Sequence, residues 1–168
     1  AVVTMPPSPS AIGAALPATG LAYAALVHTK DALEKLANAA ASSFTIMTPF
    51  LNDEGLVIAL DLFRRTRARR RHLIIRRSGS ARAAVDRGWP HLHQLNVDIL
   101  NYTLPIENGY ETFHAKIVLA DQDLAYVGSA NMTAFARHSM ELGILTDGRA
   151  ARVVASIVRG VERIATPL

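Results

Sequence analysis

Residues 113–131, FHAKIVLADQDLAYVGSAN, contain two short apolar runs separated by a polar turn, and this stretch decides the fold. The runs at 113–120 and 124–127 are rich in β-branched and apolar residues, which favours two strands joined by a turn. Because side chains alternate along a strand, we expect His114 and Lys116 on the same face of the first strand. Gly128-Ser129 follows the second strand, where small residues would let a phosphate approach the backbone closely.

The rest of the chain shows helical and strand patterns in alternation. Apolar spacing predicts helices over residues 21–41, 53–70, 80–87 and 149–165. Apolar, β-branched runs predict further strands over residues 43–51, 73–76, 97–104 and 140–146. Helices and strands that alternate early, with a hairpin late, predict an α/β fold in which helices sandwich a mixed β-sheet.

Two local signals set helix boundaries. Asn52 or Asp53 is expected to cap the helix that follows, because a short polar side chain can accept a hydrogen bond from the first free amides. Gly88-Trp89-Pro90 is expected to end the helix before it, since glycine and proline both weaken helix interiors.

Composition indicates a folded protein. Half of the 168 residues are apolar and 19% are charged, which excludes a disordered chain. Residues 1–20 are rich in Pro, Ala, Ser and Gly, so we expect a linker or loosely packed lead-in there and a catalytic domain over residues 21–168. No apolar stretch approaches the ~20 residues of a membrane span. The chain has no cysteine, which excludes a disulfide framework and fits a reducing compartment, so a bacterial cytoplasmic protein is expected.

Positive charge is concentrated in one segment. The net charge is +4, and ten arginines lie between Arg64 and Arg87. Such a cluster suits a polyanion such as nucleic acid or an anionic lipid head group. A solvated helix end in an arginine-rich sequence explains it equally well, so charge alone does not decide between partners.

Six residues then follow a fixed pattern, H-x-K-x4-D-x6-G-S-x-N. They are His114, Lys116, Asp121, Gly128, Ser129 and Asn131. The pattern resembles the active-site motif of the phospholipase D superfamily, and the shared plan covers roughly residues 33–165. In carrying a single motif, the chain is similar to the small bacterial endonucleases of that superfamily. The resemblance implies a phospholipase D-like fold and phosphodiesterase activity.

The chemistry of the motif fits that activity. A neutral imidazole can attack phosphorus and divide one hard step into two, which makes His114 the candidate nucleophile and a phosphohistidine the expected intermediate. The leaving alkoxide needs a proton, supplied by a second imidazole in its charged form. Because one chain carries one such histidine, we expect a homodimer in which a two-fold axis brings the second His114 opposite the first.

The other motif residues would bind the substrate phosphate. Lys116 supplies positive charge, and Ser129 and Asn131 supply neutral donors, aimed at the oxygens where negative charge develops. We therefore expect no metal and no cofactor. The resemblance also implies that Glu141, on the next strand, accepts a hydrogen bond from the His114 ring and fixes its tautomer.

Two residues near the motif have open roles. Asp121 is a candidate catalytic residue, but it starts the turn, and a structural role there is at least as well supported. His138 is close to the motif in sequence and is either a lining residue or an ordinary loop histidine.

Three functions remain at this point. A nuclease that cleaves DNA or RNA fits the single motif, the small size and the basic charge. A phospholipid phosphodiesterase uses the same groups, but the lipid enzymes of the superfamily typically carry two motifs in one longer chain. The third is a phospholipase D-like module of a larger anti-phage defence assembly, with a partner protein or an N-terminal domain upstream of Ala1.

Overall fold

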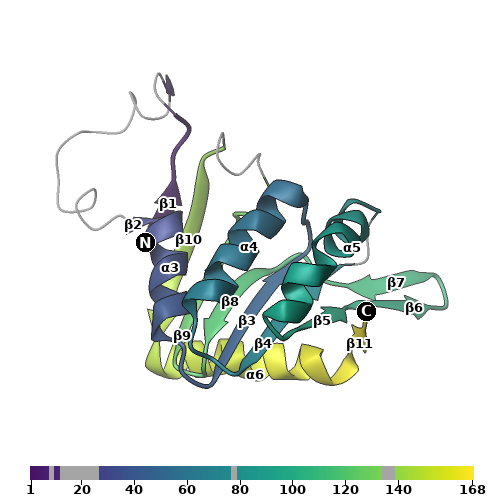
Figure 1. Cartoon of the computed structure of the whole chain (residues 1–168). Coiled ribbons are helices and arrows are strands. Elements are labelled where there is room, and N and C mark those ends of the chain that lie inside the picture. The colour runs from purple at the N-terminus through teal and green to yellow at the C-terminus, as the bar shows by residue number, and fades with distance from the viewer. Residues whose placement is uncertain (8–9, 12–26, 77–78, 134–138) are drawn as a thin grey trace.

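The computed structural model describes residues 1–7, 10–11, 27–76, 79–133 and 139–168. These residues form one nine-stranded sheet with the strand order β11-β5-β4-β3-β8-β9-β10-β1-β2 and a separate two-stranded sheet of β6 and β7 (Figure 1). The strands are β1 (Val2–Thr4), β2 (Val27–His28), β3 (Ser43–Thr48), β4 (Arg70–Ile75), β5 (Val97–Asn101), β6 (Thr103–Ile106), β7 (Gly109–Thr112), β8 (Lys116–Ala120), β9 (Leu124–Gly128), β10 (Glu141–Asp147) and β11 (Thr166–Pro167). The helices are α3 (Thr29–Ala39), α4 (Asp53–Arg65), α5 (Gly79–Gln94) and α6 (Gly148–Ile164).

The helices cover both faces of the large sheet. On one face, α3, α4 and α5 enclose a core with side chains of β3, β4, β5 and β8. On the other face, α6 crosses the sheet and packs on a second, smaller core (Figure 1). The predicted α/β sandwich on a mixed sheet is therefore confirmed, because β3, β4 and β5 are parallel to one another, β8 runs antiparallel to β3, and β9 runs antiparallel to β8.

The middle of the sheet explains why β3 reads as a continuous apolar run. β3 lies between β4 and β8, and helices cover both of its faces, so five of its six residues are buried. Next to it, β8 begins at Lys116, which pairs with Gly128 of β9. Lys116 therefore stands at the end of the sheet where β3 and β4 finish, and that end carries the candidate site.

Several expected boundaries differ from the structure, and among them the helix expected over 53–70 already ends at Arg65. The first hairpin strand begins at Lys116 rather than at residue 113, because residues 109–112 pair with β6 and the chain must turn before it joins the large sheet. The expected strand over 97–104 is divided at Tyr102, whose amide donates to the carbonyl of Ile75 at 3.0 Å. The expected helix over 21–41 begins at Thr29, after the short strand β2, and its residues 21–26 lie outside the described part.

The expected helix break at Gly88-Trp89-Pro90 is wrong, since α5 continues to Gln94 with Pro90 inside it. Packing explains this outcome. A Cβ at Gly88 would collide with the Leu56 side chain of α4, so the glycine allows the two helices to approach closely. That contact helps offset the helix hydrogen bond that proline cannot donate. The cap at Asn52 is confirmed, because its side chain accepts a hydrogen bond from the Gly55 amide at 2.9 Å.

The lead-in expected over residues 1–20 is wrong for its first residues. Val2–Thr4 forms β1, which pairs antiparallel with β10, and Val2 belongs to the main core. Thr4 also donates from its hydroxyl to that of Thr29 at 2.8 Å. Within the described residues, none of the helices has the length and apolarity needed to cross a lipid bilayer.

Candidate active site

His114 and Lys116 meet at the end of the large sheet. The Lys116 ammonium lies 2.9 Å from the His114 Nδ1 and donates to the His114 carbonyl oxygen at the same distance. Lys116 is buried, whereas His114 is exposed. Desolvation lowers the pKa of Lys116, and the charge of Glu141 opposes that shift. A buried cation held against an exposed imidazole is an arrangement typical of functional sites.

Ser129 and Glu141 form the neighbouring part of the site. The Ser129 hydroxyl donates to Oε2 of Glu141, and the same hydroxyl oxygen accepts from the Leu142 amide at 3.1 Å. The Ser129 amide also donates to the Leu142 carbonyl at 3.0 Å, so the loop after β9 is fixed against the start of β10.

The hydrogen bond expected between Glu141 and the His114 ring is not formed among the described residues. Glu141 accepts from Ser129, and the ring faces Lys116 instead. The physical reason is that the buried ammonium of Lys116 needs acceptors, and the His114 ring is within reach. Glu141 is still close enough to act on Lys116 electrostatically.

Gly128 has a packing role that the sequence did not indicate. A Cβ at Gly128, or at Gly143 beside it on β10, would collide with the buried Tyr126 ring. The packing of Tyr126 is therefore enough to require glycine at both positions. The close approach of a phosphate is not needed to explain residue 128.

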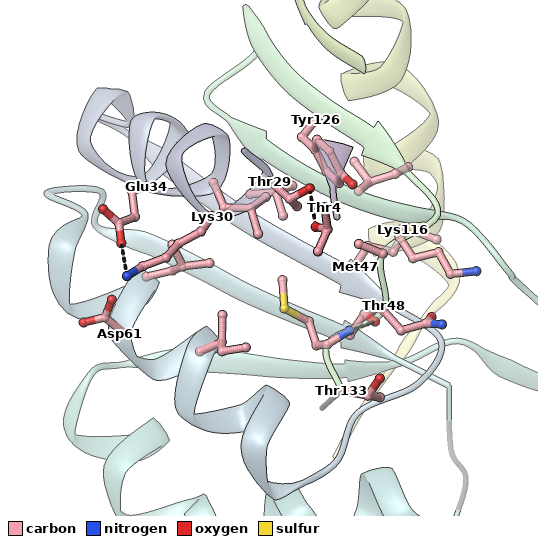
Figure 2. Close-up of a pocket in the computed structure, with 18 of the residues that line it drawn as sticks. Thr4, Thr29, Lys30, Glu34, Met47, Thr48, Asp61, Lys116, Tyr126 and Thr133 are labelled. Atoms are coloured by element: carbon pink, nitrogen blue, oxygen red, sulfur yellow. Dashed lines mark hydrogen bonds and ion pairs between the residues drawn. The ribbon is translucent and has the colours of Figure 1, made fainter. Parts of the chain in front are cut away.

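A cavity of about 500 Å³ lies between α3 and α4 and reaches the site (Figure 2). Lys116 and Asn131 line it together, and most of the remaining lining is apolar. In Figure 2, Lys30, Glu34 and Asp61 lie at the side of the cavity away from Lys116. The Asn131 Oδ1 is buried and has no hydrogen-bond partner among the described residues, which leaves this acceptor available to a donor on a ligand.

Asp121 lies at the other end of β8, and its contacts favour the structural role over the catalytic one. Its carboxylate accepts hydrogen bonds from the amides of Ala41, Ser42 and Ser43 at 3.0, 2.8 and 2.8 Å. Partial burial works to raise the pKa of Asp121, but these three hydrogen bonds and the charge of Arg70 hold it below its usual value. Asp121 therefore braces the β8–β9 turn, which is the structural alternative. His138 falls outside the described residues.

Sequence reasoning missed two residues beside His114. The Phe50 ring packs edge-on against the His114 ring with centroids 5.7 Å apart. The guanidinium of Arg76 lies 5.8 Å from the centroid of the Phe50 ring. Both residues follow the ends of neighbouring parallel strands, β3 and β4, and that placement was the signal available in the sequence.

The arginine-rich segment does not form one surface. Arg70 and Arg71 begin β4 at the end of the sheet opposite the site, and the arginines of the preceding loop lie with them. Arg82 and Arg87 lie on α5 and pair with Asp86 and Asp53. Of the described arginines in this segment, Arg76 is therefore the one placed beside His114.

No group of three or more His, Asp or Glu side chains among the described residues is arranged to hold a metal ion.

The family model described as cardiolipin synthase, PLD-like domain matches residues 33–164, which is most of the chain.

The chain belongs to the PLD-like domain family. Membership makes it a phosphodiesterase-type member of the phospholipase D superfamily. A search of curated protein sequences finds no match to this PLD-like domain.

Solved structures share the fold of this PLD-like domain at low sequence identity. NucT from Helicobacter pylori is 18% identical, with a TM-score of 0.64 over 82% of this chain and 89% of that one. Nuc from Salmonella typhimurium, a phospholipase D family member, is 13% identical, with a TM-score of 0.59 over 81% and 88%. Phosphatidylserine synthase from Haemophilus influenzae is 12% identical, with a TM-score of 0.56 over 99% of this chain and 39% of that one.

Proposed function

We propose that this PLD-like domain is a metal-independent nuclease that cleaves phosphodiester bonds of DNA or RNA through a covalent intermediate on His114. The observation that carries the proposal is the exposed His114 ring held against the buried ammonium of Lys116, in a cavity that Asn131, whose Nδ2 can donate, also lines. A cation and a neutral donor beside a nucleophile are what a phosphodiester needs, since negative charge builds on its free oxygens during attack.

Substrate binding changes the partners of His114 in this mechanism. The Nδ1 atom accepts from Lys116, which leaves the ring hydrogen of a neutral imidazole on Nε2. An anionic phosphate is a stronger acceptor for the Lys116 ammonium than an imidazole nitrogen. Once Lys116 turns to the phosphate, Nδ1–H can donate to Glu141 in the tautomer that exposes the Nε2 lone pair.

The reaction then proceeds in two balanced steps. Nε2 of His114 forms a bond to phosphorus, and the bond from phosphorus to the leaving oxygen breaks while a second, protonated imidazole gives that oxygen its proton. Water attacks the phosphohistidine next, and the second imidazole, now neutral, takes the water proton. The P–N bond breaks, and His114 returns to its starting state.

A second copy of this chain is the source of the other imidazole in the proposal. Val127 and Ile144 pair with each other on the α6 face of the sheet, and both are exposed. We define the apolar face as these two residues together with three further exposed apolar side chains on β10 and α6: Val127, Leu142, Ile144, Val153 and Ile157. It lies next to Ser129 and Glu141, so a symmetric contact through it would bring two sites together.

The cavity between α3 and α4 favours a second candidate, a phospholipid phosphodiesterase. Its largely apolar lining reaches Lys116 and Asn131, so an apolar tail could lie in it while a phosphate contacts these two residues. A nucleic-acid substrate has no apolar tail that could occupy this cavity. The nuclease is preferred because Arg76 adds a second positive charge beside His114, which a polyanionic strand can use.

One substrate panel tests the proposal. The protein is incubated with labelled single-stranded DNA, duplex DNA, RNA and phosphatidylcholine vesicles, each with and without EDTA, and His114→Ala is the control. We expect cleavage of a nucleic acid that resists EDTA and is lost in the variant. Cleavage of lipid alone would establish the second candidate, and cleavage only with added magnesium would contradict the metal-independent mechanism.

A further inference from the structure

Arg76 is a half-buried arginine whose guanidinium contacts an aromatic ring. Arg65, Arg82, Arg87 and Arg152 each form an ion pair with a carboxylate. By contrast, Arg76 is half-buried and, among the described residues, its guanidinium forms no ion pair and contacts the ring of Phe50. A partly desolvated cation without a counter-ion is favourable only where an anion can reach it.

The position of Arg76 places that anion near the scissile bond. The Phe50 ring is a common neighbour of both groups, with its centroid 5.8 Å from the guanidinium and 5.7 Å from the His114 ring. Arg76 can be no farther from His114 than these two distances combined. A nucleic-acid strand advances about 3.4 Å per nucleotide along its axis, so any separation within this limit keeps the guanidinium within about three nucleotides of the scissile phosphate.

Phe50 has a defined part in the arrangement. Its ring packs edge-on against His114, so it limits the positions that the imidazole can take. Its centroid also lies within the range at which an aromatic ring attracts a guanidinium, so Phe50 helps to hold Arg76 in place. Phe50 therefore contacts both the nucleophile and the second cation and helps to position each of them.

We propose that Arg76, positioned by Phe50, binds a phosphate that flanks the scissile phosphate in a nucleic-acid strand. The inference rests on the proposed nuclease function and deepens it, because it makes the preferred substrate a strand with several phosphates rather than an isolated diester. Arg76 is a binding residue in this account, and it takes no part in bond making or breaking.

The first experiment compares two substrates. Arg76→Gln is expected to raise KM for a single-stranded oligonucleotide about tenfold, which is the contribution of one charge-assisted contact. The same variant should lower kcat/KM for bis(p-nitrophenyl) phosphate by much less than for the oligonucleotide, since that diester has no flanking phosphate. Arg76→Lys, which keeps the charge, should recover part of the loss.

A binding measurement isolates the contact from catalysis. In a His114→Ala background, oligonucleotide affinity is measured as a function of salt. Each phosphate contact contributes about 0.7 to the slope of log affinity against log salt for a single strand. Arg76→Gln should reduce the slope by about that amount. Arg67→Gln removes the same charge from an exposed arginine at the opposite end of the sheet and should leave the slope unchanged.

The outcomes separate the two proposals. If the wild type cleaves the oligonucleotide and Arg76→Gln matches it in KM and salt slope, the flanking-phosphate site is wrong and the nuclease stands. An equal loss on both substrates, or a change of oligomeric state in sedimentation, would also overturn the site. If the wild type cleaves the small diester but neither binds nor cleaves nucleic acid, the nuclease proposal and the site fail together.

Discussion

The motif has residues at both ends of β8, and the two ends differ in how many hydrogen bonds their polar groups form within the protein. At the turn end, Asp121 accepts three backbone hydrogen bonds from residues 41–43. At the other end, the Lys116 ammonium is buried and contacts the His114 ring, and both of these groups can form other hydrogen bonds when a ligand binds. The Asn131 Oδ1 there has no hydrogen-bond partner among the described residues. The difference teaches that completed hydrogen bonds mark the structural half of the motif, and available ones mark the half that meets a ligand.

The largest effect on activity is expected from His114→Ala. Removing the nucleophile should lower kcat/KM for the cleaved substrate by at least about a thousandfold. Because His114 is exposed, thermal unfolding should change little. Initial rates and a melting curve on the same preparation measure both. A variant that retained a tenth of the wild-type rate would contradict the role of this residue.

Lys116→Met is expected to separate activity from stability. Loss of the cation should lower kcat by roughly 10²–10³-fold, the range for removing one group that stabilises developing charge. Burial lowers the pKa of Lys116, so the charged lysine destabilises the fold at neutral pH, and the methionine variant should be as stable or more stable.

The lowered pKa of Lys116 also predicts the direction in which the stability of the fold changes with pH. Wild-type stability should rise as pH increases from the lowered folded-state pKa of Lys116 towards 10.5, because the unfolded chain binds the extra proton in that window. The Met variant should lack this rise in chemical denaturation. A large fall in the stability of the variant at pH 7 would place Lys116 with the structural half of the motif.

Asp121→Asn tests the turn end. We expect the free energy of unfolding to fall by about 1–3 kcal/mol, because hydrogen bonds to a charged acceptor are weakened, while kcat per folded molecule is retained. Asparagine tolerates the left-handed backbone of residue 121, where φ is 53°, so the substitution isolates the carboxylate. Asp123→Asn, which removes an exposed ion pair with Arg152, is the matched control and should cost less than about 1 kcal/mol.

The loss from Asp121→Asn should also depend on pH. The pKa of Asp121 is lowered in the folded state, so its contribution is complete above the usual value of 3.8 and disappears as pH falls through the lower, folded-state pKa. Unfolding curves of wild type and variant should therefore converge in strong acid. Equal separation of the curves at pH 7 and in strong acid would mean that the charge has no part in bracing the turn.

The smallest effect is expected from Ser129→Ala. Its hydroxyl orients Glu141 and accepts from the Leu142 amide, so its loss should lower kcat by about tenfold through misplacement of Glu141. Ser129→Thr keeps the hydroxyl and should recover most of the rate. If Ala and Thr variants were equally slow, the hydroxyl would not be the group that matters.

The fold and the residues of the site were largely predictable from sequence, because strand patterns and fixed motif spacing are local properties. The contacts between those residues were not. Whether the His114 ring faces Glu141 or Lys116 depends on which acceptor a buried ammonium reaches across the folded chain. Arg76 and Phe50 were missed for a related reason, since they are 26 residues apart and meet because β3 and β4 end side by side.

The short strands at the edges of the sheet were also not predicted from the sequence. Val2–Thr4 and Thr166–Pro167 are too short to show a strand pattern, and they pair only because β10 and β5 offer free edges. The continuous helix α5 was not predicted for a similar reason. Pro90 lies inside it, and the contact that supports this part of the helix is between Gly88 and Leu56 of α4, which is in another part of the chain.

Direct detection of the covalent intermediate tests the central claim most closely. A substrate labelled at the scissile phosphate is mixed with the protein, the reaction is stopped in alkali, where phosphohistidine survives, and peptides are analysed by mass spectrometry. The account predicts a phosphorus adduct on His114 that appears during turnover, persists in EDTA and is absent from His114→Ala. Rapid turnover of the label with no adduct on His114 at any time point, or an adduct on another residue, would contradict it.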